Sequence, residues 1–214
     1  MVRIVLASAL MLTSLGACSG ERTGEGAKQP GAASAGPDEA EAEFWKALEI
    51  DGNWVEFHAS LPVLTAASDL VVVAELTAIE AGPSIQGDAV EDVVSHAVLR
   101  AHVVELLRGR APGDQIELQL VLPEVLRPAD LAPTVARMNR TLPRGSVLLM
   151  LRTRGDAPEW RPVNGYGIWA QTPRAQIDSP LNPQPPNEDI YGAELAELAD
   201  FQRFVDAIRG YARN

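Results

Sequence analysis

The chain has 214 residues, of which 46% are hydrophobic, and it carries a formal net charge of −11. The hydrophobic share is ordinary for a globular protein and excludes wholesale disorder, and the length suits one domain with a tether. The negative charge argues against a nucleic acid partner, because proteins normally meet phosphates with clusters of Lys and Arg.

A short apolar segment opens the chain. Arg3 gives it a basic start, residues 4–15 are almost wholly apolar, and small residues lead to Cys18, the one cysteine in the sequence. This arrangement is typical of a secretory signal that ends at a cleavage site. The apolar run is well short of the ~20 residues that a membrane-spanning helix needs.

The residues Leu15-Gly16-Ala17-Cys18 resemble the lipobox of bacterial lipoproteins. The resemblance implies a signal peptide over residues 1–17 that is removed, and a Cys18 that carries acyl chains such as palmitate. It also implies export and anchoring at the outer face of the cell membrane, or at an outer membrane if the host has one. The alternative is a secreted protein with a chance cysteine. A lone cysteine in an exported protein forms no internal disulfide, and lipidation explains its presence.

The next segment predicts a tether, and a folded domain follows it. Residues 18–37 are rich in Gly, Ala, Ser and Pro and hold no large apolar side chain, which is typical of a flexible linker. We expect a single globular domain over residues 38–214. Two short helices should open it, one over residues 38–49 with Asp38 as its N-cap and one over residues 61–68.

Alternating apolar residues then predict strands. Residues 70–79 are rich in β-branched side chains and predict the first strand. Residues 96–107 and 116–122 alternate between apolar and polar side chains, with the turn signal Pro112-Gly113 between them. We therefore expect these two segments to form an antiparallel hairpin.

The second half of the domain should hold two more strands and a closing helix. A short helix near residues 135–140 precedes an apolar run at 147–151, which predicts a central strand. Residues 160–170 predict a fifth strand, interrupted by glycines. The prolines between residues 173 and 186 predict an extended surface segment. Residues 194–211 predict an amphipathic C-terminal helix.

Together these elements predict a mainly β fold with peripheral helices, namely a small antiparallel barrel of five to six strands with an amphipathic C-terminal helix. The hydrophobic spacing and glycines of residues 69–76, 103–109 and 144–151 resemble netrin-like and OB-type β-barrels, the fold of tissue inhibitors of metalloproteinases. The resemblance implies a fold and no inhibitory activity, because this domain lacks the cysteines of the eukaryotic members.

No motif in the sequence predicts catalysis, a metal or a cofactor. A nucleophile elbow, a phosphate-binding loop and a dinucleotide fingerprint are all missing from it. His96 and His102 lie six residues apart on one predicted strand, about 20 Å, so they cannot share a metal ion. We expect both histidines on the exposed strand face, and Glu75 in solvent on the polar face of the first strand.

One segment has the character of a binding surface. Trp160, Asn164, Tyr166 and Trp169 fall within ten residues, and aromatic side chains of this kind anchor protein interfaces or stack on sugars. The alternative, which we favour, is that these aromatic side chains fill the core, because only 5% of the residues are aromatic.

The sequence therefore predicts a membrane-anchored lipoprotein of the cell envelope whose domain is a non-enzymatic binding or interaction module. We expect its partner to be an envelope protein. Two alternatives stay open. One is a hydrolase that acts on envelope glycans or peptides through carboxylates that folding brings together. The other is an inhibitor of an exported hydrolase, and it depends on analogy of fold alone.

Overall fold

A computed structural model describes residues 37–49, 57–86, 93–123, 126, 128–153, 159–172, 176–181, 191–198 and 200–213. The predicted signal peptide at residues 1–17, the anchor Cys18 and the tether up to residue 36 lie outside the described residues. Most of the proline-rich segment between residues 173 and 186 lies outside them too.

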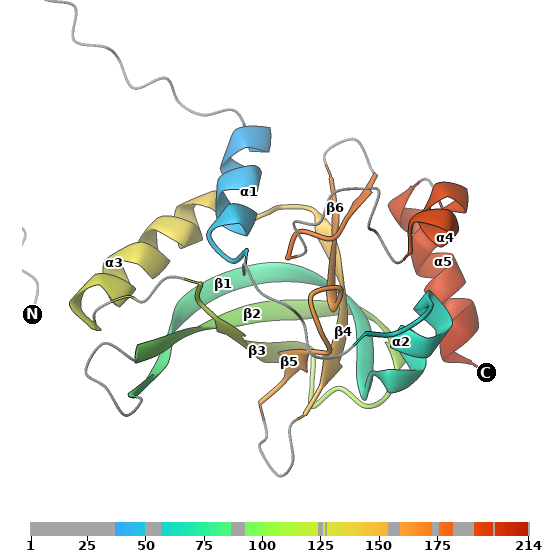
Figure 1. The fold of residues 1–214 in the computed structure, drawn as a ribbon, viewed down its shortest axis with the longest axis horizontal. Coiled ribbons are helices and arrows are strands. Elements are labelled where there is room, and N and C mark those ends of the chain that lie inside the picture. Colours follow the sequence, from blue (N-terminus) through green and yellow to red (C-terminus); the bar gives the residue numbers. More distant parts are fainter. Residues whose placement is uncertain are drawn as a thin grey trace, which may run out of the picture. The chain divides into compact units, whose positions relative to one another are not determined.

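A seven-stranded sheet forms the centre of the domain (Figure 1). Its strands follow the order β3-β2-β1-β4-β6-β7, and β5 pairs with β4 beside this path. The paired strands are antiparallel, and the path is open. This confirms the predicted mainly antiparallel β fold with helices. The strands are β1 (Leu70–Gln86), β2 (Val93–Arg108), β3 (Gln115–Val121), β4 (Ser146–Arg152), β5 (Arg161–Pro162), β6 (Ile168–Gln171) and β7 (Ile177–Asp178).

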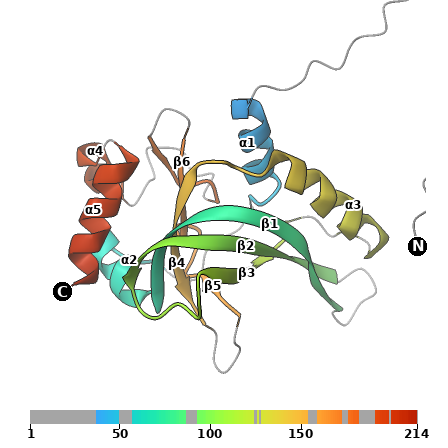
Figure 2. The same ribbon diagram turned by 180° about the vertical axis from the view of Figure 1, so that it is seen from behind.

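Helices lie at both ends of the long strands β1 and β2. Helices α1 and α3 lie toward one end, and α2, α4 and α5 lie toward the other (Figures 1 and 2). Their bounds, with the 3-10 turn η1, are α1 (Pro37–Lys46), α2 (Leu61–Ala67), α3 (Pro128–Met138), η1 (Asn139–Thr141), α4 (Gly192–Glu197) and α5 (Phe201–Ala212).

Strands β1 and β2 run further than the sequence predicted. The sequence predicted that the first strand ends before Gly82, because glycine favours turns. The structure instead places a register shift between Ala81 and Ser84, and the pairing continues beyond it to Gln86. A β-bulge inserts an unpaired residue and bends the strand, so the ladder can pass a glycine and a proline without ending.

Two other elements are divided where the sequence predicted continuous ones. The predicted helix at 194–211 breaks into α4 and α5, because Asp200 adopts an extended backbone and its side chain accepts the N–H of Arg203 at 2.9 Å as an N-cap. The predicted strand at 160–170 breaks into β5 and β6 around a tight turn. Gly167 closes that turn, and a Cβ there would lie 2.7 Å from the Cβ of Pro162.

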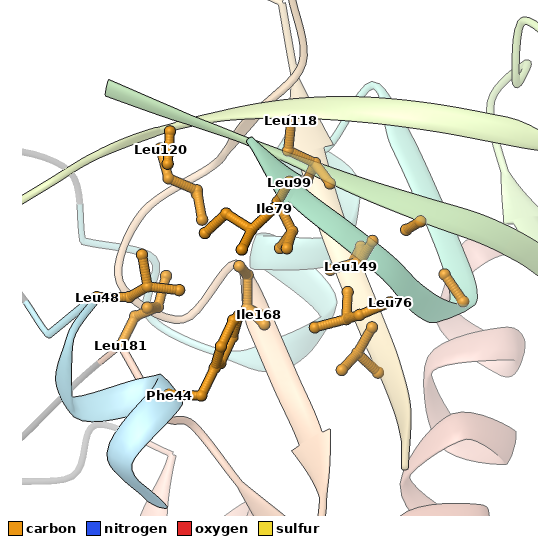
Figure 3. Packing of buried hydrophobic residues seen from close by; sticks show 14 of the residues in the cluster. Phe44, Leu48, Leu76, Ile79, Leu99, Leu118, Leu120, Leu149, Ile168 and Leu181 are labelled. Carbon is orange, nitrogen blue, oxygen red and sulfur yellow. The ribbon is translucent and has the colours of Figure 1, made fainter. Parts of the chain in front are cut away.

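The core consists of two apolar clusters on opposite faces of the sheet. Leu70 and Val72 of β1 belong to the first cluster, and Val71 and Val73 belong to the second. The first cluster includes α1 and α3 residues, and Figure 3 shows Phe44 and Leu48 packed beside Ile168 and Leu181. The second cluster lies under α2 and α5 and holds Trp169, Tyr191 and Phe204. The continuous apolar run of β1 therefore reflects burial on both faces.

An ion pair joins α5 to the sheet. Nε and Nη2 of Arg209 donate to the two carboxylate oxygens of Glu105 on β2, at 2.9 and 2.8 Å. Arg209 also pairs with Asp206 one turn earlier on α5. The two carboxylates raise the pKa of the Arg209 guanidinium above its ordinary value. This bidentate arrangement fixes the orientation of the helix more strongly than a single contact.

Two glycines in the β2–β3 connection provide a matched test of the fold. Gly109 has a φ of +83°, and a Cβ there would lie 2.0 Å from the carbonyl oxygen of Asp69. A Cβ at Gly113 would meet no atom within 4 Å. We expect Gly109→Ala to lower the free energy of unfolding by about 2–4 kcal/mol, and Gly113→Ala to change it by less than about 0.5 kcal/mol. Urea unfolding of the full chain measures both. Equal effects of the two substitutions would contradict this packing.

Candidate functional site

Three of the four aromatic and amide residues that the sequence singled out are buried together, and the fourth, Trp160, lies apart from them. Asn164, Tyr166 and Trp169 are 3%, 5% and 1% exposed. The rings of Tyr166 and Trp169 stack with their centroids 5.8 Å apart in the second cluster. Trp160 packs partly buried against the first cluster instead. The burial of the first three matches the alternative in which these residues fill the core.

Asn164 has a structural contact inside the turn between β5 and β6. Its Oδ1 accepts the backbone N–H of Tyr166 at 2.9 Å, which is the geometry of an Asx turn. The turn directs Tyr166 toward Tyr191, with ring centroids 4.8 Å apart and planes at 86°. The ring centroid of Trp169 in turn lies 4.8 Å from that of Phe204 on α5. The short aromatic segment therefore connects the sheet to the C-terminal helix.

Trp160 lines a groove of about 570 Å³ that follows β3. We call this hollow the β3 groove. Five consecutive residues of β3 contribute to it, although Ile116 and Leu118 point their side chains into the first cluster. Backbone atoms of β3 therefore contribute to the lining, because side chains on one face would come from alternate residues only. The remaining lining residues are Pro83, Val98, Pro112 and Glu159.

The chain segment that carries Trp160 contacts β3 on the side away from β2. Leu118 and Trp160 form an isolated parallel bridge, and the N–H of Gln119 donates to the carbonyl oxygen of Trp160 at 2.9 Å. Arg161 strengthens this contact, because its Nη2 donates to Oε1 of Gln119 at 2.7 Å. The backbone of Trp160 is therefore held beside the edge of β3.

The charged residues that line the β3 groove are both acidic, Glu117 and Glu159. Nε of Arg100 lies 3.2 Å from the carboxylate of Glu117, and Nη2 of Arg100 lies 3.2 Å from that of Glu80. These side chains are largely exposed, so the ion pairs stabilise the fold by little. Gln115 adds an amide, whose Nε2 lies 3.3 Å from Nδ1 of His102. The groove thus combines an indole, amides and carboxylates.

The other polar residues considered from the sequence lie apart from a shared site. Glu75 is exposed. His96, which we expected on an exposed face, is only 4% exposed, and its Nδ1 lies 3.0 Å from the carbonyl oxygen of Pro83. The bulge between Ala81 and Ser84 brings the carbonyl group of Pro83 beside this ring. Within the described part of the chain, no cluster of His, Cys, Asp and Glu could hold a metal ion.

A second hollow, of about 610 Å³, lies between the ends of α2, β2 and α5. Its arginine, Arg108, is engaged with the fold: Nε donates to the carbonyl oxygen of Ser68 at 3.1 Å, and Nη2 reaches that of Ala66 at 3.5 Å. The guanidinium therefore satisfies carbonyl groups at the end of α2. The β3 groove, with its strand edge and indole, is the stronger candidate.

The sequence indicated some residues of this groove but not that they lie together. The alternation of Gln115, Glu117 and Gln119 indicated a polar strand face, and Trp160 was singled out for its indole. Their juxtaposition depends on a bridge between residues 118 and 160, more than forty positions apart. Local periodicity carries no information about such a contact.

Comparison with known proteins found no matching family model, no similar curated protein and no similar solved structure. Among the described residues, none of the helices combines the length and the apolar character needed to cross a membrane.

The contact made by Asn164 leads to a prediction about its role. Asn164→Ala removes the acceptor for the N–H of Tyr166 in a buried turn, and an unsatisfied buried N–H costs about 1–3 kcal/mol. We therefore expect the free energy of unfolding to fall by that amount, with the fluorescence of the buried Trp169 changing in the same transition. Unchanged stability would show that the turn does not depend on this side chain.

Proposed function

We propose that this chain is a lipid-anchored, non-enzymatic binding protein of the cell envelope, whose β domain captures a protein partner in the β3 groove. We choose this place because Trp160, which is only partly buried, lines a groove beside the edge of β3. Tryptophan is among the residues that most often dominate the energy of protein interfaces.

The lipid anchor is supported by the sequence alone. Leu15-Gly16-Ala17 precedes Cys18, and the basic and apolar residues before them suit a signal peptide. Two acyl chains are enough for stable membrane attachment. The net charge of −11 gives no electrostatic attraction to anionic lipid, so the acyl chains would supply the binding. The proposed location is the outer face of the cell membrane, or an outer membrane where the host has one.

We also propose that the curled sheet is an OB-type or netrin-like barrel. The bridge between Leu118 and Trp160 supports this, because it brings β3 beside the segment that leads into β5. Strand β5 pairs with β4, β4 with β1, and β1 with β2, which pairs with β3. These neighbours follow one another around a ring of five strands, and OB-type barrels are five-stranded and partly open.

A second candidate is a hydrolase that acts on an envelope glycan or peptide. The observation that favours it is that two carboxylates, Glu117 and Glu159, line the same groove. Glycan hydrolysis uses such a pair. Glu117, however, already pairs with Arg100 on the exposed sheet face, which suits a binding surface better than a general acid. Release of product from an envelope glycan or peptide, lost in Glu159→Gln, would favour this candidate.

The anchor leads to a first prediction. We expect the chain to incorporate an alkyne analogue of palmitate and to sediment with membranes, and we expect Cys18→Ser to lose both properties. Ser19→Ala is the matched control and should keep them, because it changes the neighbouring residue only. Labelling that persists in Cys18→Ser, or a Cys18 thiol that reacts with maleimide in the mature protein, would contradict lipidation.

The groove leads to a second prediction, tested by a photo-crosslinking amino acid placed in the full chain in living cells. At Gln115, which lines the groove and is exposed, we expect a discrete adduct with a protein. At Glu197, exposed on α4, we expect no such adduct. Trp160→Ala should weaken the Gln115 adduct. Equal adducts from both positions, or none from Gln115, would remove the groove as the binding place.

A further inference from the structure

We infer that the segment captured in the β3 groove is an extended, basic peptide that pairs with the edge of β3 as an added strand. This inference rests on the proposed function and names the kind of partner that the groove would take. It follows from three properties of the groove: the direction of its backbone groups, its length and its charge.

The direction of the backbone groups follows from two hydrogen bonds. The N–H of Gln119 points away from β2, because it donates to the carbonyl oxygen of Trp160. The N–H of Leu122 points toward β2, where it donates to the carbonyl oxygen of Ser95. Backbone groups alternate in direction along a strand, so those of Gln115 and Glu117 point the same way as that of Gln119, away from β2.

The groove follows an edge that the described strands leave open. Strand β2 pairs with all of β3 on one side. On the other side, among the described residues, pairing is confined to the bridge at Leu118 and Trp160. An unpaired strand edge is a template for another strand, and peptide recognition by strand addition uses such an edge. Before the bridge, the edge from Gln115 to Glu117 spans about 7 Å, enough to pair with two to three residues of an extended peptide.

The charge of the groove determines the chemistry of the peptide. Glu117 and Glu159 line it, and no Lys or Arg is among its lining residues. Glu117 already pairs with Arg100, so Glu159 is the carboxylate that the groove offers to the peptide. Glu159 is exposed, so its carboxylate can meet a cation from the peptide at the surface of the domain. The indole of Trp160 can receive an arginine or lysine side chain on its face. A basic peptide with alternating side chains therefore fits better than an acidic one.

Peptide binding to the full chain in detergent micelles tests this inference. The probe is a fluorescent octapeptide that alternates lysine with valine. Two comparison peptides are used. In the first, alternate backbone N–H groups of the probe are methylated, so that one edge of the extended peptide cannot donate hydrogen bonds. In the second, each lysine of the probe is replaced by glutamate. We expect the lysine peptide to bind. Methylation of the edge that faces β3 should weaken binding at least about tenfold, and the glutamate peptide should show no binding.

Two charge-reversal variants separate the groove from general acidity of the chain. Glu159→Lys should weaken binding of the lysine peptide about fivefold or more, and Glu197→Lys on α4 should leave it unchanged. Equal binding of the methylated and unmethylated peptides, or equal effects of the two variants, would overturn strand addition. If the lysine peptide does not bind while Gln115 still crosslinks to a protein, strand addition falls and the proposed function stands. If the lysine peptide does not bind and Gln115 also forms no adduct, both strand addition and the proposed binding function are contradicted.

Discussion

Burial of β1 on both of its faces is the constraint on which the rest of the domain depends. Leu70 and Val72 enter one apolar cluster while Val71 and Val73 enter the other, and Leu148 and Leu149 of β4 divide in the same way. Helices must therefore cover both faces of this part of the sheet, since residues 70–74 of β1 are buried on both faces. The positions of α1 and α3 on one cluster, and of α2 and α5 on the other, follow from this requirement.

The same two strands also place the candidate site. Strand β1 carries β2 and then β3 on one side, and β4 carries β5 on the other. Because the sheet curls, the outer strands of these two branches approach each other at Leu118 and Trp160. The β3 groove lies where they meet. The buried strands β1 and β4 thus bring the edge of β3 and the Trp160 segment together.

The sequence predicted elements whose signals are local. The alternation of Ile116, Glu117 and Leu118 identified β3, and the apolar run of β4 identified a central strand. Features that depend on distant contacts were missed. The bulge after Ala81 lengthens β1 and β2, and it brings the carbonyl group of Pro83 beside the ring of His96.

The aromatic segment illustrates the same limit, because an isolated cluster of aromatic residues looks alike whether it faces solvent or the core. Tyr166 and Trp169 are buried because they pack against Tyr191 and Phe204, whereas the position of Trp160 depends on a single bridge to β3.

Residue-resolved amide hydrogen exchange in the unbound full chain tests the open edge of β3 most directly. The amides of Gln115 and Glu117 should exchange at least about tenfold faster than those of Ile116 and Leu118, which face β2. Uniformly slow exchange at these four amides would show that the edge is already paired, and would contradict the binding site assigned to it.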